Sequence, residues 1–279
     1  MNYRHAFHAG GFVDVMKHAV LALILERLKA KDAPFCVLDT HAGIGRYDLW
    51  SEPAQKTGEF RDGIVKALAP PTEALLEPYL AVIRRMNRGE RDIRWYPGSP
   101  LLTQALIRPQ DRLVLIELHP EDVRSLTREV ARDARVRVHH EDGYTALKAF
   151  LPPQERRGLV LIDPPFELKD EFARIVRGLR QAHRRWATGT YMIWYPIKHR
   201  APVRRFHDDL VASGIRRILA AELLLCPDDD PERLNGSGLV FVNPPWGLDD
   251  ALRALLPSLL RRFGATKTGR TEIATLVPE

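Results

Sequence analysis

The sequence is poor in cysteine and has no long apolar segment, and each absence excludes a class of protein. Only two cysteines occur among 279 residues, and both lie within apolar runs, where a small buried thiol is ordinary. We therefore expect neither a disulfide framework nor a zinc site. No apolar run approaches the roughly 20 residues that cross a bilayer. The N-terminus also lacks the charged head, apolar middle and cleavage site of a secretory signal, so we expect a soluble cytoplasmic protein with no membrane partner.

Acidic residues are outnumbered by basic ones, 36 to 42, which gives a net charge of +6 and an isoelectric point near 9.4. A basic balance favours a polyanionic partner such as nucleic acid. The excess is mostly arginine, with 33 Arg against 9 Lys, and the base composition of a genome can produce the same skew. Charge alone therefore leaves a nucleic-acid partner and a merely basic surface both open.

Short apolar runs rich in β-branched residues recur along the chain, and turn residues follow each of them. Five runs lie at residues 35–38, 113–118, 136–139, 159–162 and 191–195. Unbroken apolar runs, with amphipathic segments between them, indicate strands buried on both faces. Two further runs, at residues 218–226 and 238–242, indicate an antiparallel pair. The sequence therefore predicts an α/β protein with a mostly parallel, seven-stranded sheet and helices on both faces.

About 75 residues separate the first run from the second, which is too long for a structureless loop. Within this gap, five apolar residues fall on one face of a predicted helix at residues 72–88. They are Leu75, Leu76, Tyr79, Leu80 and Ile83. We therefore predict a small helical insert at about residues 47–96, within one domain of residues 1–279.

Acids and glycines follow the first three predicted strands. An acid and a glycine turn with Gly43 and Gly45 end the first strand, and such glycines let the backbone approach a ligand closely. Glu117 ends the second strand, where an acid can bind both ribose hydroxyls of an adenosine. Asp142 and Gly143 follow the third, a place suited to reading an adenine edge. Each signal alone fits a dinucleotide enzyme equally well, but together they predict an adenosine-containing cofactor.

The fourth strand run ends in Asp163-Pro164-Pro165-Phe166. Two prolines fix the backbone and remove two donors, so carbonyl oxygens face the site without competing N–H groups. The Asp163 carboxylate and the Pro164 carbonyl can each accept one hydrogen of an exocyclic amine. Phe166 offers a face on which an extruded base can stack. An amine held in this way can attack the sulfonium methyl of S-adenosylmethionine, a reaction that needs no metal. A dehydrogenase would have no need for such an amine-binding motif.

A second motif of this kind, Asn243-Pro244-Pro245-Trp246, follows the last predicted strand. It comes after the antiparallel turn, where a parallel-sheet active site would not place its catalytic loop. We therefore assign these residues a structural role and expect Trp246 to cap the core.

The chain resembles class I amino-methyltransferases that use S-adenosylmethionine and carry a [D/N]-P-P-[Y/F/W] motif. More closely, it resembles the RlmJ family of bacterial 23S ribosomal RNA adenine(2030)-N6-methyltransferases. The resemblance covers essentially the whole chain, through YRHAFHAGGFVDVMKHAVL, LDTHAGIGRYDL, WYPGSP, ELHP, EDGY, LVLIDPPFE, ATGTYMIWYP and NPPW.

This resemblance implies a Rossmann-like methyltransferase fold, S-adenosylmethionine as cofactor and an N-terminal lid at about residues 1–18. It implies direct in-line methylation of N6 of adenine 2030, flipped out of 23S ribosomal RNA in a naked or partly assembled large subunit. We expect the enzyme to be a monomer.

The resemblance also implies roles for individual residues. The cofactor pocket would comprise His18, His41, Gly43, Ser99, Glu117, Asp142, Gly143 and Asp163. Asp163 would accept the proton, with Pro164 and Phe166 beside it, and Tyr3 would contact the RNA. Lys17, beside His18, is a candidate partner for the cofactor carboxylate or for an RNA phosphate. The sequence departs from related patterns at two positions. Phe166 stands where a member of the RlmJ family has tyrosine, which keeps the aromatic face and loses a hydroxyl. His41 stands where many methyltransferases have glycine, although this histidine is part of the RlmJ-like pattern.

Several other residues have competing interpretations. His5, His8 and His18 form a cluster, but zinc usually needs four placed ligands and no cysteine is near, so we expect no metal. The arginines at 124, 128 and 132 alternate with acids and fit a solvated helix face. Residues 198–205, KHRAPVRR, and the insert's arginines are candidate RNA contacts. These arginines are Arg84, Arg85, Arg88, Arg91 and Arg94. Trp95, Tyr96, Trp194 and Tyr195 could stack on bases, but most aromatic residues beside apolar runs belong to the core, so we assign none of them to the site.

Two rival functions remain open at this point. Enzymes that carry the same motif also methylate adenine or cytosine in DNA and glutamine in proteins. Alternatively, the chain could be a ribosome-assembly protein that binds RNA and has lost catalysis, although the intact Asp163 and Gly43 argue against such decay.

Overall fold

The computed structural model describes residues 4–279, and its main sheet has eight strands in the order β10-β8-β9-β7-β6-β1-β4-β5. The strands are β1 (Cys36–Asp39), β4 (Arg112–Glu117), β5 (Val136–His140), β6 (Gly158–Ile162), β7 (Thr190–Ile197), β8 (Ile218–Leu224), β9 (Gly236–Val242) and β10 (Arg270–Val277). Strands β5, β4, β1, β6 and β7 are parallel, whereas β9 is antiparallel to both β7 and β8. The predicted mostly parallel Rossmann-like sheet is confirmed.

The expected number of seven strands is wrong by one, because β10 adds an edge strand antiparallel to β8. Its sequence, RTEIATLV, mixes polar and apolar residues, and none of them is fully buried. An edge strand with one solvated face does not need the unbroken apolar run by which the interior strands are recognised, and β5 at the other edge is likewise only partly buried. Two three-residue strands, β2 (Arg46–Asp48) and β3 (Trp95–Pro97), form a separate antiparallel ribbon that is too short to give a sequence pattern.

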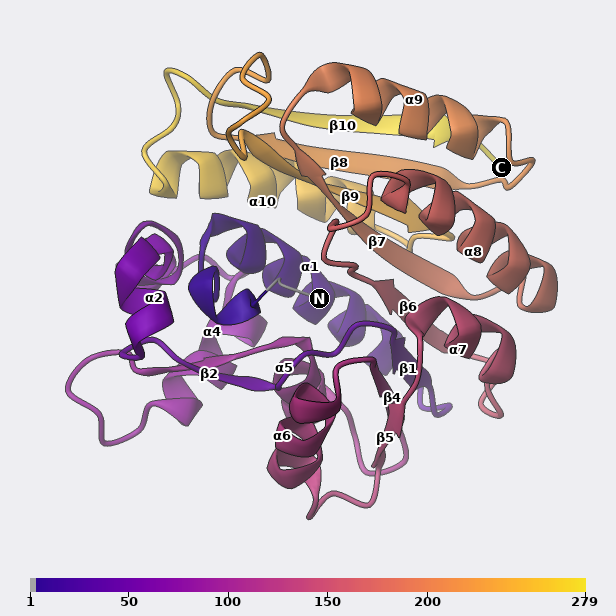
Figure 1. Cartoon of the computed structure of the whole chain (residues 1–279), viewed down its shortest axis with the longest axis horizontal. Coiled ribbons are helices and arrows are strands. Elements are labelled where there is room, and N and C mark those ends of the chain that lie inside the picture. Colours follow the sequence, from indigo (N-terminus) through magenta and orange to yellow (C-terminus); the bar gives the residue numbers. More distant parts are fainter. Residues whose placement is uncertain (1–3) are drawn as a thin grey trace.

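Helices cover both faces of the sheet (Figure 1). Side chains alternate between two cores along the strands: Val37 points into one, and Leu38 into the other. The first core includes residues of α1 (Phe12–Lys29), α5 (Ser99–Leu106), α6 (Pro120–Val130) and α10 (Leu248–Arg262). The second includes residues of α7 (Gly143–Ala149), α8 (Glu171–Arg185) and α9 (Arg200–Val211). Within residues 4–279, none of the helices combines the length and apolar composition needed to span a membrane.

The segment between β2 and β3 is helical and lies to one side of the sheet (Figure 1). It contains α2 (Glu52–Thr57), a π-helical turn η2 (Arg61–Val65), a single turn α3 (Lys66–Leu68) and α4 (Glu77–Met86). Helix α4 begins at Glu77 rather than at residue 72, with Pro78 in its first turn, where a missing N–H costs nothing. Tyr79, Leu80 and Ile83 are buried in the first core.

Helix α1 is buried over most of its circumference, with 13 of its 18 residues inaccessible to solvent. Such a helix belongs to the interior of a fold. It is preceded by a short 3-10 turn, η1 (His5–Phe7). The predicted lid at residues 1–18 therefore overlaps this core helix from Phe12 onward. Asp14, Lys17 and His18 are buried with it and need polar partners inside the protein.

The two Pro-Pro motifs lie at opposite ends of the parallel strands, the first at their carboxyl ends and the second at their amino ends. Val242 pairs with Tyr191, near the start of β7, whereas Ile162 pairs with Ile193 further along the same strand. The Asn243 amide donates to the carbonyls of Ala187 and Gly189, both at 2.8 Å, and so joins two segments of the chain. Asn243 thus has a structural role.

The expectation that Trp246 caps the core is wrong, because this side chain is 96% exposed. The loop is held by its backbone instead: Arg27 donates to the carbonyls of Trp246 and Gly247. These bonds fix the loop and leave the indole ring in solvent.

Asn243→Ala should lower the free energy of unfolding by about 2 kcal/mol. The variant loses two hydrogen bonds and places alanine at a φ of 51°. Trp246→Ala, its control, should leave stability unchanged, since the ring buries nothing. Urea unfolding of both variants measures this difference, and equal stabilities would contradict the structural role of Asn243.

Candidate active site

The turns after four parallel strands meet at one edge of the sheet. Strand β1 pairs with both β4 and β6, and β4 pairs with β5, all in parallel. In a doubly wound sheet, ligands bind outside these carboxyl ends. The residues that follow Asp39, Glu117, His140 and Ile162 therefore share one site.

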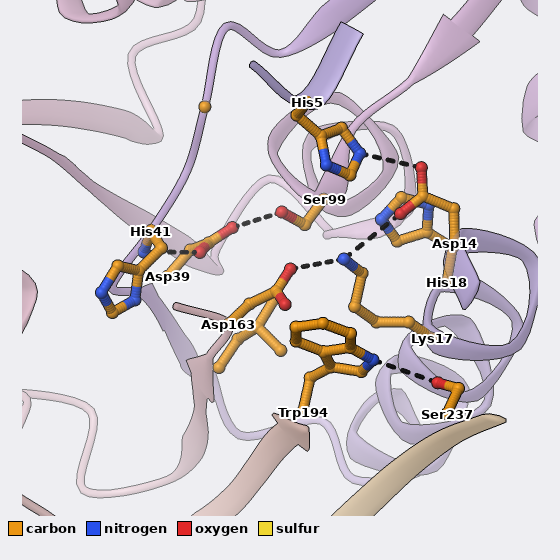
Figure 2. Close-up of polar contacts among 12 residues, drawn as sticks. His5, Asp14, Lys17, His18, Asp39, His41, Ser99, Asp163, Trp194 and Ser237 are labelled. Carbon is orange, nitrogen blue, oxygen red and sulfur yellow. Dashed lines mark hydrogen bonds and ion pairs between the residues drawn. The ribbon is translucent and has the colours of Figure 1, made fainter. Parts of the chain in front are cut away.

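A buried ion pair joins α1 to the turn after β6 (Figure 2). Lys17 Nζ donates to Asp163 Oδ2 at 2.5 Å, and it lies 3.2 Å from Asp14 Oδ1. Burial alone would lower the pKa of Lys17, but the two carboxylates raise it above its usual value. Lys17 therefore stays charged. Among the described residues, nothing hydrogen-bonds to the second oxygen of Asp163, Oδ1, which leaves that oxygen available to a ligand.

Asp14 connects this ion pair to the N-terminal turn. Its Oδ2 accepts hydrogen bonds from His5 Nε2 at 2.9 Å and from the Gly10 N–H at 3.0 Å. Burial would raise the pKa of Asp14, yet the neighbouring His5 and Lys17 outweigh burial and hold this pKa well below its ordinary value. The segment before α1 is thus tied to the same charges as the turn after β6.

A second polar group lies at the end of β1 (Figure 2). Asp39 accepts hydrogen bonds from Ser99 Oγ at 2.6 Å and from the His41 N–H at 3.3 Å. Burial raises the pKa of Asp39 to about 7, and nearby Asp163 adds to the rise. Burial also lowers the pKa of His41 to about 4, so its ring is neutral. Thr40 Oγ1 lies 2.8 Å from His41 Nδ1 and holds the ring in place.

Glu117 is fixed by the backbone at the tip of β4. Its carboxylate accepts from the N–H groups of Gly43 and His119, both at 2.8 Å. A carboxylate has about four acceptor positions, so two remain for a ligand. Gly43 has a φ of 63°, a conformation that suits glycine and turns the chain tightly above β1.

The turn after β5 approaches the turn after β1 very closely. A Cβ atom on Gly143 would lie 2.3 Å from the carbonyl oxygen of Thr40, so only glycine fits. Asp142 caps α7, accepting from the Thr145 N–H at 2.9 Å. Its other oxygen lies 3.6 Å from Arg174. Three carboxylates, Glu117, Asp142 and Asp163, therefore line the edge.

Phe166 has a strained backbone at the end of the first Pro-Pro motif. Its φ is 52°, a region that a bulky residue rarely occupies. The ring packs edge-on against Phe172, with centroids 5.0 Å apart, and against Trp194 at 5.5 Å. Trp194 in turn lies 5.7 Å from Lys17 Nζ and donates to Ser237 Oγ at 3.0 Å (Figure 2). Strain held by such surroundings often marks a functional turn.

A sequence model of the family "Ribosomal RNA large subunit methyltransferase D, RlmJ" matches residues 32–277. The chain belongs to the RlmJ family. A protein of Escherichia coli (strain K12), named ribosomal RNA large subunit methyltransferase J, is 46% identical over 280 residues and covers 100% of both chains. A protein of the same name from Haemophilus influenzae is 44% identical over 281 residues, again with 100% of both covered.

A crystal structure of a Legionella pneumophila protein has the same overall fold. It superposes with a TM-score of 0.89 at 34% identity, covering 96% of this chain and 98% of the other. As a member of the RlmJ family, the chain is a methyltransferase, which confirms the expectation of an enzyme.

Not every site residue expected from the RlmJ resemblance lies in this group. His18 is 1% exposed and its Nδ1 bonds to the Tyr96 hydroxyl at 2.8 Å, which also contacts the Tyr79 hydroxyl. Burial lowers the pKa of His18 to about 3. Tyr3, the expected RNA contact, lies outside the described residues. The histidines near the N-terminus have separate partners, and residues 4–279 contain no group of three potential metal ligands.

Asp14 and Trp194 belong to the site but were not identified from the sequence. Asp14 lies one helical turn before Lys17, and this i,i+3 spacing is the signal that could have indicated the pair. Trp194 ends an apolar run and is indistinguishable there from a core residue. Among the expected RNA contacts, Arg200 is neutralised internally by Glu222 at 2.7 Å and Asp228 at 2.5 Å.

The raised pKa of Asp39 predicts a pH-dependent stability. The unfolded chain releases this proton near pH 3.8 and the folded chain near 7, so between these values the folded state binds more protons. The Asp39 contribution to the free energy of unfolding must therefore fall as pH rises from about 4 to about 7.

Asp39→Asn removes that contribution. Urea unfolding at a series of pH values gives the free energy of unfolding of both proteins. The difference, wild type minus variant, should decrease between about pH 4 and about pH 7 and be constant above that range. A difference that does not change with pH would contradict the buried, proton-binding carboxyl.

Proposed function

We propose that this protein transfers a methyl group from S-adenosylmethionine to the N6 amine of adenine 2030 in 23S ribosomal RNA. The observation that carries the proposal is the Asp163 carboxylate, fixed by Lys17 through one oxygen and open at the other, at the sheet edge where an adenosine cofactor would lie. The names of the Escherichia coli and Haemophilus influenzae relatives support ribosomal RNA of the large subunit as the substrate.

The residues at the carboxyl edge suit S-adenosylmethionine. Glu117, held by two backbone N–H groups, has acceptor positions left for the ribose hydroxyls. One oxygen of Asp142 caps α7, and the other can accept a hydrogen bond from the adenine amine of the cofactor. Gly43 and Gly143 keep side chains out of the space between the turns. His41 and Ser99 lie beside Asp39 and would contact the methionine part of the cofactor. His18 would support this pocket from α1, where it bonds to Tyr96.

When bound, the cofactor supplies an electrophilic methyl group on a sulfonium. Asp163 Oδ1 and the Pro164 carbonyl accept the two hydrogens of the adenine amine and so aim its lone pair at this methyl group. As the new N–C bond forms and the old S–C bond breaks, the amine loses one proton to Asp163. Lys17 keeps Asp163 in one orientation. Positioning and placed acceptors therefore account for most of the acceleration.

The adenine must leave its base stack to reach this site. Phe166, braced by Phe172 and Trp194, offers an aromatic surface for the extruded base. We propose that the N-terminal residues up to Gly11 close over it, with Tyr3 as a substrate contact. Lys17 is buried against Asp14 and Asp163, so it holds Asp163 instead of an RNA phosphate. Arg4 pairs with Glu121 on α6 at 3.5 Å, so this segment reaches from α1 across to α6. The substrate would be naked or partly assembled large-subunit RNA, bound by a monomer.

Asp163→Ala should abolish methyl transfer while the variant keeps its fold and at least part of its cofactor affinity. Lys17 retains Asp14 as a partner, so the substitution leaves no buried charge alone. Loss of the proton acceptor and amine ligand should reduce kcat by roughly a hundredfold or more. Calorimetry with S-adenosylmethionine and transfer of a labelled methyl group to 23S RNA measure the two effects.

Asn243→Ala serves as the matched control, because it alters the other Pro-Pro motif and should methylate RNA at the wild-type rate. Undiminished transfer by Asp163→Ala would refute the mechanism. Incubation of wild-type enzyme with labelled cofactor and separate RNA, DNA and protein pools tests the substrate class. Mass spectrometry of 23S RNA from cells that lack the protein tests the methylated position, which should be unmodified only there.

A further inference from the structure

Two tryptophans and two arginines form a row on and beside the ribbon made by β2 and β3. Arg46 lies 4.7 Å from the ring centroid of Trp95, Arg94 lies 4.5 Å from the same ring, and Arg94 also lies 5.2 Å from Trp50. We call the four residues the arginine–tryptophan ladder. Trp50 is 48% exposed, although large aromatic rings are normally covered.

Acidic neighbours hold both guanidinium groups in these positions. Arg94 donates to Asp48 through Nε at 3.3 Å and Nη2 at 3.0 Å, and Arg46 donates to Glu129 at 2.8 Å. The backbone N–H of Trp50 also donates to Asp48 Oδ1, at 2.9 Å. Because the side chains are already ordered, a ligand that stacks on them loses little further conformational entropy.

The ladder lies on the outer side of a ribbon whose inner side contacts the active site. Residues alternate across a strand, so Tyr47 and Tyr96 face inward while Arg46 and Trp95 face outward. The Tyr47 ring lies 5.0 Å from that of His5. Strand β2 begins directly after Gly45, and β3 ends two residues before Ser99. The ribbon is therefore joined at both ends to turns of the site.

We propose that the arginine–tryptophan ladder is a stacking platform for unpaired bases of the RNA that flank the target adenine. Aromatic rings and guanidinium planes are the surfaces on which proteins stack single-stranded bases. A base on the exposed face of Trp50 would extend a stack that is already formed. This inference rests on the proposed RNA methylation and names where the rest of the substrate binds.

Trp50→Ala should weaken binding of a single-stranded RNA oligonucleotide about tenfold, within the range known for one stacked base. Trp50→Phe keeps an aromatic face and should lose less than threefold. Trp246→Ala removes a tryptophan that is even more exposed and lies far from the ladder, beside the other Pro-Pro motif, and this variant should bind like wild type. Fluorescence anisotropy measures the affinities, and thermal unfolding of each variant verifies the fold. Equal affinities for wild type and Trp50→Ala would overturn the proposal.

Arg94→Lys separates stacking from charge, because lysine keeps the positive charge and loses the planar guanidinium. We expect weaker binding with an unchanged dependence on salt concentration. In methylation assays Trp50→Ala should raise KM for RNA more than it lowers kcat. If wild type methylates RNA but Trp50→Ala has the same KM, the platform is wrong and the proposed function stands. If wild type methylates no RNA, the proposed function fails whatever the ladder binds.

Discussion

The buried ammonium group of Lys17 is the charge on which the site depends. An ion removed from water costs several kcal/mol unless carboxylates surround it, and Lys17 has two, Asp14 from its own helix and Asp163 from the turn after β6. Docking of α1 beside that turn therefore gives Lys17 a second carboxylate partner in addition to Asp14. The same pair fixes the orientation of Asp163. One interaction thus links the packing of the first helix to the chemistry of the fourth parallel strand.

Sheet direction and backbone strain together distinguish the two Pro-Pro motifs. The first follows a strand that runs with its parallel neighbours and ends among the other turns of the site. The second follows β9, which runs the other way and ends at the far edge. Both motifs contain a residue with φ near 50°, but Asn243 tolerates that conformation and Phe166 does not. A strained phenylalanine persists because its surroundings hold it, as expected of a functional turn and not of a simple loop.

The strands that are buried on both faces could be predicted from the sequence almost to the residue, because complete burial produces an unbroken apolar run. Edge strand β10 could not, since half of its surface faces solvent and its sequence is mixed. The turns of the site were predictable for the same topological reason: they follow those strands. Asp14 was not, because its role depends on how α1 docks. Trp246 was misassigned because an aromatic residue after an apolar strand usually enters the core, whereas here Arg27 holds the loop backbone and the ring stays outside.

A carboxylate-rich site that acts on a polyanionic substrate requires that the substrate's backbone be bound by another part of the surface. Glu117, Asp142 and Asp163 line the carboxyl edge and would repel phosphates there. In the proposed reaction only the uncharged base needs to enter, so it must be drawn away from its backbone, at a cost in lost stacking. Contacts elsewhere have to offset that cost. The outer side of the β2–β3 ribbon suits this purpose, because it offers arginines and an exposed ring close to the site, while Tyr47 and Tyr96 separate its charges from the carboxylates within.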